Sequence, residues 1–175
     1  MHIRPETPED ATAIADVTTA AFEPMAYSDG SEVAIIRALR DAGDLTWSLV
    51  AEDAGEIVGH VAFSPVTIGG SDDVWFGLGP VSVAPDRQRR GVGRKLIETG
   101  LAELRRAGAS GCVLVGDPGY YGQFGFIGDG PLTYLDVDKK FVQYLVLNGA
   151  DPEGDRQWKV LSFFESSDEQ EHPQR

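Results

Sequence analysis

The sequence is poor in cysteine and has no long hydrophobic run. Its single cysteine, Cys112, cannot form a disulfide within the chain, which favours a reducing compartment such as the cytoplasm. No apolar run approaches the roughly 20 residues that a membrane-spanning helix needs. The first residues also lack the apolar segment of a signal peptide. We therefore predict a cytoplasmic protein that has no membrane as a partner.

Basic residues are scarce as well. The chain has 15 Lys and Arg residues against 28 Asp and Glu residues, a net charge of −13. A surface of this sign repels nucleic acid and anionic lipid, so it argues against both as partners and mildly favours cationic substrates such as amines. The same acidity also suits proteins of high-salt or high-GC organisms. The charge therefore limits the partners without naming one.

The length and composition are ordinary for one soluble domain. The chain has 175 residues, of which 42% are hydrophobic and 25% are charged. We expect a single domain over residues 1–164. Residues 165–175 are polar and highly charged, and this composition is typical of a disordered tail.

Two helices are predicted near the N-terminus. The first begins with Thr7 as its N-cap and Pro8 in its first turn. The second covers residues 29–42 and is capped by Ser28 or Asp29. Both carry apolar residues at the spacing of one helix face.

Strands dominate the rest of the chain. Runs of β-prone residues predict strands at 47–52, 56–68, 74–83, 112–115, 141–147 and 158–164. A helix predicted over 91–107 makes a βαβ unit, which requires parallel strands, whereas the hairpins before it are antiparallel. We therefore predict an α/β (α+β) protein with a mixed, mostly antiparallel sheet of six to seven strands, a central βαβ unit and flanking helices.

The loop between the strand at 74–83 and the helix at 91–107 carries an anion-binding pattern. Glycines at a helix N-terminus let the backbone approach a ligand, and the free N–H groups there bind phosphate. Basic residues gather in this otherwise acidic chain at Arg87, Arg89, Arg90, Arg94 and Lys95. A P-loop would need a Lys-Ser or Lys-Thr pair after Gly93, and a Rossmann fingerprint would need a third glycine where Leu96 stands. Both alternatives fail.

What remains is Gln88-x-x-Gly91-x-Gly93, which resembles the pyrophosphate-binding motif of the GNAT superfamily of N-acetyltransferases. A second segment, Asp117-Pro-Gly-Tyr-Tyr-Gly-Gln-Phe-Gly-Phe126, follows the next strand and is similar to the Phe-Tyr-x-x-Phe-Gly-Phe type segment of many GNAT proteins. Two motifs in this order, separated by one helix and one strand, are improbable by chance. The resemblance covers about residues 1–126.

The resemblance implies that acetyl-CoA is the donor substrate. Its pantetheine arm would lie between two splayed parallel strands, here 74–83 and 112–115, and Pro80 offers a reason for the splay because proline cannot donate to a sheet ladder. Backbone groups of Val81 and Val83 would pair with the pantetheine, and an N–H near Val81 or Ser82 would polarise the thioester carbonyl. The implied coenzyme contacts also include Gln88, Arg89, Arg90, Gly91, Val92, Gly93, Arg94 and Asp117.

The same resemblance implies catalytic residues. Tyr121 aligns with the tyrosine that protonates the departing coenzyme A thiolate in several family members, whereas Tyr120 is expected to pack or to contact substrate. A proton acceptor for the attacking amine is less evident. Glu23 is our first choice, and the other candidates are Asp29, Glu32, His60 and a chain of water molecules. Cys112 begins an apolar strand and is expected to be inert.

The predicted function is transfer of an acetyl group from acetyl-CoA to a primary amine of a small molecule or peptide, by direct attack in a ternary complex. An alternative from another class is a domain that binds acyl-CoA as a sensor or structural ligand without significant catalysis. Nucleic-acid binding through the basic loop is disfavoured because the cluster is short and the chain is acidic. No metal site is predicted. The acceptor and the oligomeric state stay open, a homodimer included.

Overall fold

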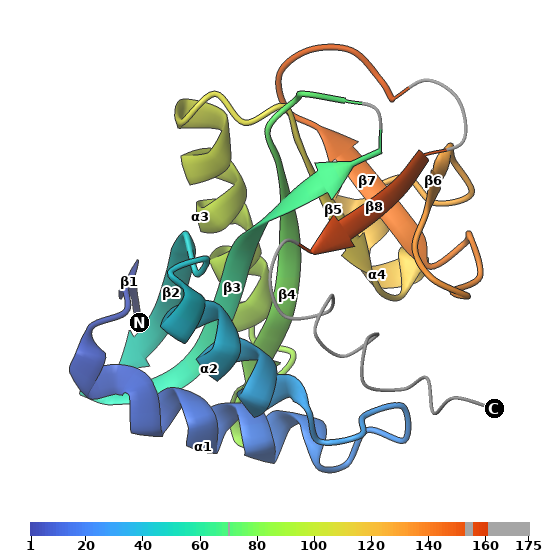
Figure 1. Ribbon diagram of the computed structural model, residues 1–175. Helices are drawn as coiled ribbons and strands as arrows, with labels where there is room; N and C mark the ends of the chain where they lie inside the picture. The colour runs from blue at the N-terminus through green and yellow to red at the C-terminus, as the bar shows by residue number, and fades with distance from the viewer. Residues whose placement is uncertain (70, 153–155, 161–175) are drawn as a thin grey trace, which may run out of the picture. The chain divides into compact units, whose positions relative to one another are not determined.

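The computed structural model describes residues 1–69, 71–152 and 156–160 (Figure 1). Internal contacts divide the chain into two compact units. The first unit consists of Met1–Phe63 and Gly79–Ala102, and the second of Ser64–Leu78 and the chain from Glu103 onward. The tail predicted at 165–175, and with it the domain boundary at 164, lies outside the described residues.

The strands form a mixed sheet. Their order is β1-β2-β3-β4-β5-β7, and β8 pairs with both β3 and β6. Of the pairs whose register is described, β4–β5 and β6–β8 are parallel and the others are antiparallel. The strands are β1 (His2–Pro5), β2 (Trp47–Asp53), β3 (Glu56–Ile68), β4 (Trp75–Val83), β5 (Gly111–Val115), β6 (Leu132–Thr133), β7 (Val142–Val146) and β8 (Arg156–Val160). The predicted mixed, mostly antiparallel sheet with one βαβ unit is confirmed.

The longer helices lie before β2 and between β4 and β5. The helical segments are η1 (Pro8–Asp10), α1 (Ala11–Phe22), α2 (Glu32–Ala42), η2 (Pro85–Arg87), α3 (Val92–Arg106), α4 (Pro118–Tyr121) and η3 (Gly122–Phe124). Short elements such as β1, β6 and α4 were not predicted, because runs of two to five residues carry too little periodicity to be recognised.

The predicted start of the second helix was wrong. Helix α2 begins at Glu32 rather than at residue 29, with Ser31 as its N-cap. The residues expected to cap it instead shape the preceding turn: Ser28 Oγ donates to Glu32 Oε1 at 2.7 Å, and Asp29 Oδ1 accepts from Ser31 N–H at 2.9 Å. Such local side-chain hydrogen bonds compete with helix formation.

In the first unit, helices cover both faces of the strands. Figure 1 shows α1 and α2 on one face and α3 on the other. Ile14 of α1, Ile36 of α2 and Val50 of β2 form one buried cluster. On the opposite face, a Cβ atom added at Gly59 of β3 would come within 3.0 Å of Leu96 of α3. The two apolar layers hold the strands between them.

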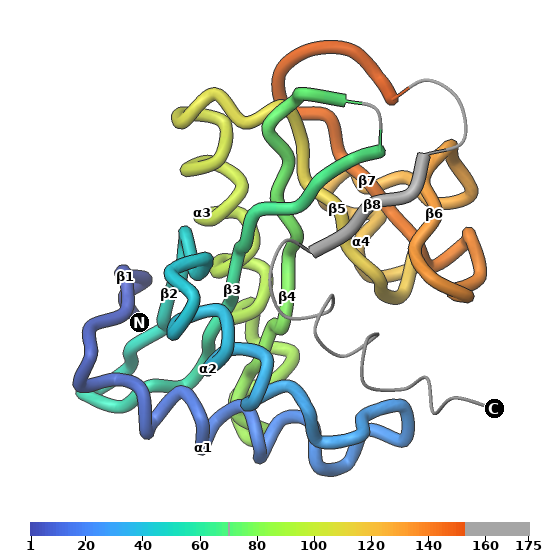
Figure 2. Tube along the Cα trace, in the orientation of Figure 1, coloured from blue at the N-terminus to red at the C-terminus, as the bar shows by residue number. Residues whose placement is uncertain are grey.

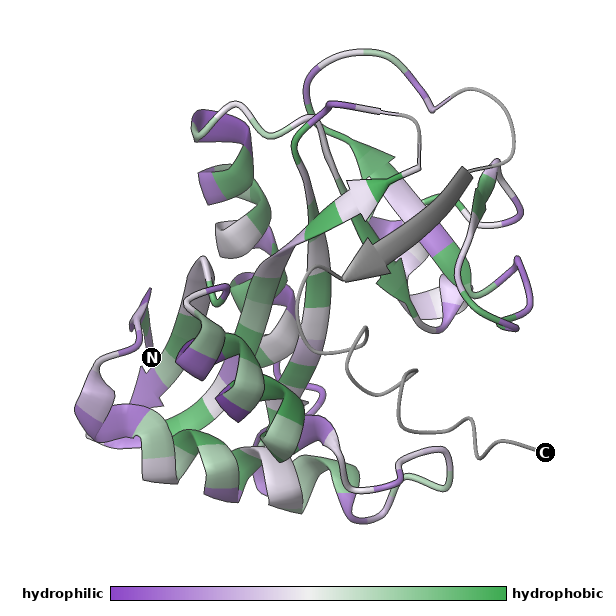
Figure 3. Cartoon of the chain, in the orientation of Figure 1, coloured by the Kyte–Doolittle hydropathy of each residue, from purple (hydrophilic) through white to green (hydrophobic). Residues whose placement is uncertain are grey.

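Helix α3 approaches β3 closely. A Cβ atom placed on Gly100 would lie 2.1 Å from Phe63 Cε2, far inside van der Waals contact. The helix buries an amphipathic stripe against the sheet, and Figure 3 shows hydrophobic and hydrophilic residues alternating along its ribbon. As predicted, the stripe consists of Val92, Leu96, Ile97, Leu101 and Leu104. The bare Gly100 backbone therefore sets how near the helix can come.

In the second unit, β5 lies between β4 and β7. The β4–β5 pairing runs from Trp75↔Gly111 to Gly77↔Val113, and the paired residues of β4 all precede Pro80. This agrees with the splay expected near Pro80, where proline cannot donate to a sheet ladder. Strand β5 pairs along its length with β7 in antiparallel register.

Replacing Gly100 by alanine is expected to lower the free energy of unfolding by about 1–3 kcal/mol, the usual penalty of overpacking, although alanine is the better helix former. Urea unfolding followed by circular dichroism measures this. The Gly100→Ala, Phe63→Leu double variant should recover part of the loss, because leucine removes the ring that meets the new methyl group. A Gly100→Ala variant as stable as the parent would contradict the close packing.

Candidate active site

The segment between β4 and α3 is a shaped loop within the first unit (Figure 2). Arg89 has a φ of 61° and Gly91 a φ of 81°, so the backbone turns through the left-handed region twice before the helix starts. Gln88 Nε2 donates to Val83 O at 3.1 Å and ties the loop to the end of β4. The loop thereby leads directly into the N-terminus of α3.

The N-terminus of α3 presents donors. Lys95 N–H donates to Gly91 O at 3.1 Å, so the amide groups earlier in the first turn have no acceptor inside the helix. Helix α3 has 15 residues, long enough for its aligned peptide dipoles to favour an anion at this end. The predicted loop residues Gln88, Arg89 and Arg90 are exposed. The geometry fits a phosphate group.

The basic residues in and after the loop have different partners. Arg87 forms ion pairs with Asp53, at the end of β2, and with Asp86, and Asp53 also holds the N-terminal ammonium group at 3.2 Å. Arg94 Nε pairs with Glu98 at 2.8 Å on the exposed face of the helix. Arg87 therefore holds the loop against the β2–β3 hairpin through Asp53, a contact that no sequence pattern predicts.

The side chain of Ser82 is buried and already hydrogen-bonded. The side chain is 1% exposed, and its hydroxyl donates to Thr18 Oγ1 of α1 at 3.1 Å. Val81 and Val83, its neighbours in β4, are half-buried. The buried hydrogen bond fixes this end of β4 to α1 and was missed because two hydroxyl residues 64 positions apart show no sequence pattern.

The second predicted motif begins at α4, in the second unit. Asp117 is the N-cap of this helix, and its Oδ1 accepts from Gly119 N–H at 2.9 Å. Tyr121 is half-buried, and its ring centroid lies 4.9 Å from that of Tyr120 and 6.2 Å from that of Phe126. Aromatic packing therefore holds Tyr121, as expected for a residue of fixed orientation.

The candidate proton acceptors lie at or after the end of α1. Glu23 is exposed and its N–H closes the helix on Thr19 O at 2.9 Å. Asp29 and Glu32 lie in the following turn and at the start of α2, and hydrogen bonds from Ser31 lower the pKa of Asp29. The first unit thus contains these carboxylates together with the loop, whereas Asp117 and Tyr121 belong to the second unit.

His60 belongs to a buried polar cluster rather than to an accessible site. Its side chain is fully buried, and Nε2 lies 2.7 Å from Ser48 Oγ and 3.6 Å from Glu6 Oε2. Arg40 holds the same Glu6 carboxylate through two hydrogen bonds of 2.8 and 3.1 Å. Burial lowers the pKa of His60, which keeps the imidazole neutral at pH 7. We interpret the cluster as structural.

The pKa of Glu6 falls to about 2. Burial works against the charged form, but the neighbouring His60, Arg40 and Ser48 side chains together outweigh it. Glu6 follows β1, Arg40 lies on α2, and Ser48 and His60 lie on β2 and β3. One carboxylate therefore ties the N-terminal strand to a helix and to the sheet.

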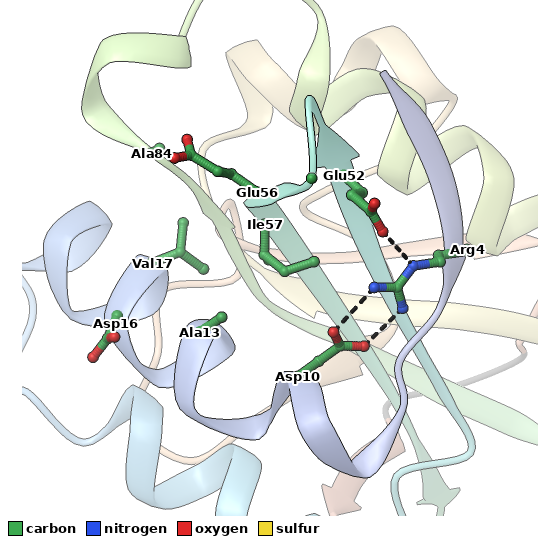
Figure 4. Close-up of a pocket in the computed structure, with 10 residues that line it drawn as sticks. Arg4, Asp10, Ala13, Asp16, Val17, Glu52, Glu56, Ile57 and Ala84 are labelled. Atoms are coloured by element: carbon green, nitrogen blue, oxygen red, sulfur yellow. Dashed lines mark hydrogen bonds and ion pairs between the residues drawn. The ribbon is translucent and has the colours of Figure 1, made fainter.

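A hollow of about 580 Å³ opens in the first unit, beside the β2–β3 hairpin (Figure 4). At its wall, Arg4 Nε donates to Glu52 at 2.7 Å, and its Nη atoms donate to Asp10 at 2.7 and 3.0 Å. Arg4 holds the pKa of Asp10 well below its usual range. Of the β4–α3 connection, Ala84 lines the hollow and the loop at Gln88–Gly93 does not.

Other chemistries find little support in the described ranges. Within residues 1–69, 71–152 and 156–160, no cluster of three or more His, Cys, Asp or Glu side chains is arranged to hold a metal ion. None of the helices described there combines the length and hydrophobicity needed to cross a bilayer. Cys112 is buried, and burial raises the pKa of its thiol far above its usual range, so it stays protonated.

A model of the acetyltransferase (GNAT) domain family matches residues 2–127, which include both motifs. The chain belongs to the GNAT family. The match agrees with the span of about residues 1–126 expected from the motifs. The matched range runs from the N-terminal helices through the antiparallel strands to the βαβ unit.

Named relatives of this GNAT protein share most of its length. The uncharacterized N-acetyltransferase YhbS of Escherichia coli K12 is 40% identical over 127 residues, or 72% of this chain and 73% of the relative. A GNAT family acetyltransferase from Brucella melitensis, crystallised with acetyl-CoA, is 54% identical with a TM-score of 0.77, covering 89% of this chain and 93% of that one. Escherichia coli YhbS crystallised with CoA has a TM-score of 0.80 at 32% identity, covering 90% and 89%.

Lowering the pH is expected to destabilise the fold through the Glu6 cluster. His60 has a folded pKa below its ordinary 6.5, so protonation favours the unfolded chain as the pH falls below that value. The Glu6 contribution is complete above 4.5 and is lost as the pH falls toward 2. Urea unfolding from neutral pH to about pH 3 should show a shallower acid loss for Glu6→Gln than for the parent.

The exposed Glu98, which pairs with Arg94 on the helix surface, provides the control, and Glu98→Gln should follow the parent profile. Equal acid slopes for the parent and Glu6→Gln would refute the role given to the cluster.

Proposed function

We propose that the protein binds acetyl-CoA and transfers its acetyl group to a primary amine of a small molecule or peptide. The observation that carries the proposal is the loop between β4 and α3, where backbone donors at a helix N-terminus lie among exposed arginines. The family supports it, as do two similar structures that contain acetyl-CoA or CoA. Coenzyme A carries a pyrophosphate, the kind of anion that such a loop binds.

Donor binding would rest mainly on backbone groups. The amides from Gln88 to Arg94 would hold the pyrophosphate, with Arg89, Arg90 and Arg94 adding charge-assisted hydrogen bonds. Backbone groups of Val81 and Val83 would pair with the pantetheine arm, and an N–H near Val81 or Ser82 would stabilise the negative charge that develops on the thioester oxygen. The buried Ser82 side chain supports this division, since its hydroxyl is already bonded to Thr18.

The reaction would follow direct attack. The neutral amine attacks the thioester carbonyl carbon, the new C–N bond forms, and the C–S bond breaks to release the coenzyme A thiolate. Tyr121 would donate its phenolic proton to that thiolate, because a phenol is protonated at pH 7. The proton lost by the amine would pass to Glu23 or to water. Asp117 would contribute by capping the helix that carries Tyr121.

The charge of −13 suits a cationic acceptor, since amines are protonated in solution at neutral pH.

We further propose a single functional domain over residues 1–164 in the cytoplasm, with a homodimer as one open arrangement. The alternative, an acyl-CoA sensor without significant catalysis, makes the same prediction for coenzyme binding and the opposite one for turnover.

Coenzyme release measured across a panel of small amines and peptide N-termini tests the reaction. The parent should release coenzyme A with at least one acceptor, and Tyr121→Phe should lower kcat about 100- to 10,000-fold with little change in acetyl-CoA affinity, the range for loss of a general acid. Unchanged kcat in Tyr121→Phe would remove this residue from the mechanism. Tight acetyl-CoA binding with no turnover on any acceptor would favour the sensor.

Replacing Gly91 by alanine tests the loop. Gly91 has a φ of 81°, and the C-cap glycine of α2, Gly43, has a φ of 76°, and neither has an atom within 4 Å of an added Cβ. Alanine at either position should cost roughly 1–2 kcal/mol of stability through the same backbone strain. Only Gly91→Ala should weaken acetyl-CoA binding, about tenfold if the substituted loop must take up this strained conformation again in order to bind. Equal affinities of the two variants, measured by calorimetry, would argue against the loop as the coenzyme site.

A further inference from the structure

A buried amide connects β7 to the end of β5 in the second unit. Gln143 of β7 is 0% exposed, and its Nε2 donates to the carbonyl oxygen of Gly116 at 2.9 Å. Gly116 directly follows β5, and its N–H donates to Phe141 O at 3.0 Å. Both polar groups of Gly116 are therefore held by residues at or next to the start of β7.

Gly116 also forms the surface on which Tyr121 packs. A Cβ atom added at Gly116 would lie 2.5 Å from Tyr121 Cε2 and 2.9 Å from Cδ2, so the ring rests against bare backbone. The backbone of Tyr121 is held as well, because its N–H donates to Asp117 O at 3.0 Å. A displacement of the Gly116 peptide would move the support of the phenol ring.

The other polar atom of the Gln143 amide, Oε1, shows which interaction stabilises this side chain. Within the described part of the chain, Gln143 Oε1 is buried and has no hydrogen-bond partner. A buried carbonyl without a partner is unfavourable, and an apolar side chain of similar shape would avoid this cost. The orientation of the amide follows from its partner, since only the NH₂ end can donate to the Gly116 carbonyl. Among the described residues, the contact with Gly116 is thus the polar interaction that stabilises this side chain.

We propose that Gln143 is a positioning residue for the acetyl-transfer reaction: it fixes the Gly116 peptide and, through it, the ring of Tyr121. The inference rests on the proposed role of Tyr121 as the group that protonates the thiolate. Proton transfer requires the phenol oxygen to lie within hydrogen-bond reach of the sulfur, and a misplacement of about 1 Å can lower a rate about 100-fold. A fixed support for the ring therefore contributes directly to turnover.

The test replaces Gln143 by methionine, which keeps the length of the side chain and removes the donor. We expect kcat to fall by up to about 100-fold, while KM and the affinity for acetyl-CoA change less than about twofold. In the Tyr121→Phe background the same replacement should have little further effect, because a residue that acts through the phenol cannot act without it. Additive losses in the double variant would overturn the proposal.

A matched control exists at the other end of β5. Asn148 Nδ2 donates to Ala109 O at 2.9 Å, so it is a second side-chain amide that bonds a carbonyl next to this strand, although Asn148 itself is exposed. Asn148→Ala removes this bond far along the strand from Gly116 and should leave kcat unchanged. An equal fall of kcat in Asn148→Ala and Gln143→Met would assign Gln143 to the stability of the strand pair alone.

A readout that does not depend on catalysis separates this inference from the proposed function. NMR shifts of the Tyr121 ring should change in Gln143→Met and not in Asn148→Ala. If the ring signals move and Tyr121→Phe retains full activity, the positioning contact stands and the role of Tyr121 fails. If Tyr121→Phe is impaired and Gln143→Met changes neither kcat nor the ring signals, the positioning role fails. Should Gln143→Met not fold, Gly116→Ala displaces the ring directly, and unaltered ring signals there would overturn the proposal.

Discussion

Helix α3 lies as near to strand β3 as it does because two facing positions carry no side chain. A methyl group on Gly100 would overlap the ring of Phe63, and one on Gly59 would press against Leu96. The N-terminus of a helix that packs this tightly is fixed relative to the strand beneath it. The donor groups of the loop at Gln88–Gly93 are therefore preorganised, and the proposed binding of pyrophosphate would not have to order a flexible segment first.

Positive charge is concentrated locally in a chain that is acidic overall. A chain of net charge −13 keeps exposed arginines at one helix N-terminus, whereas Arg87, earlier in the same loop, forms ion pairs with Asp53 and Asp86. Elsewhere in the first unit, arginines form ion pairs with carboxylates: Arg4 binds Asp10 and Glu52, and Arg40 binds Glu6. These contacts join β1 to a helix and to the sheet, so the acidic composition is partly structural rather than a ligand surface.

The features that the sequence predicted well are those set by backbone rules. Alternating apolar residues bounded by a turn predicted the limits of β3 at Glu56 and Ile68, and the glycines before α3 indicated a loop whose backbone turns through the left-handed region. Side-chain interactions between distant residues left no such pattern. The sequence makes His60 a candidate base, but in the structure its partners are Ser48 and Glu6. The residues expected to cap α2 instead form hydrogen bonds in the turn that precedes this helix. Tertiary contacts decided the first case, and local side-chain hydrogen bonds decided the second.

The same distinction explains why the donor can be inferred more sharply than the acceptor. Pyrophosphate recognition by a helix N-terminus depends on peptide groups, which glycine positions and a helix start make visible in a sequence. Selectivity for an amine depends on individual side chains. The carboxylates available near the end of α1, Glu23 and Asp29, are exposed, so water and salt screen their attraction for a cation. The described acids can therefore favour amines as a class by their charge, and discrimination among amines must come from shape and hydrogen bonding.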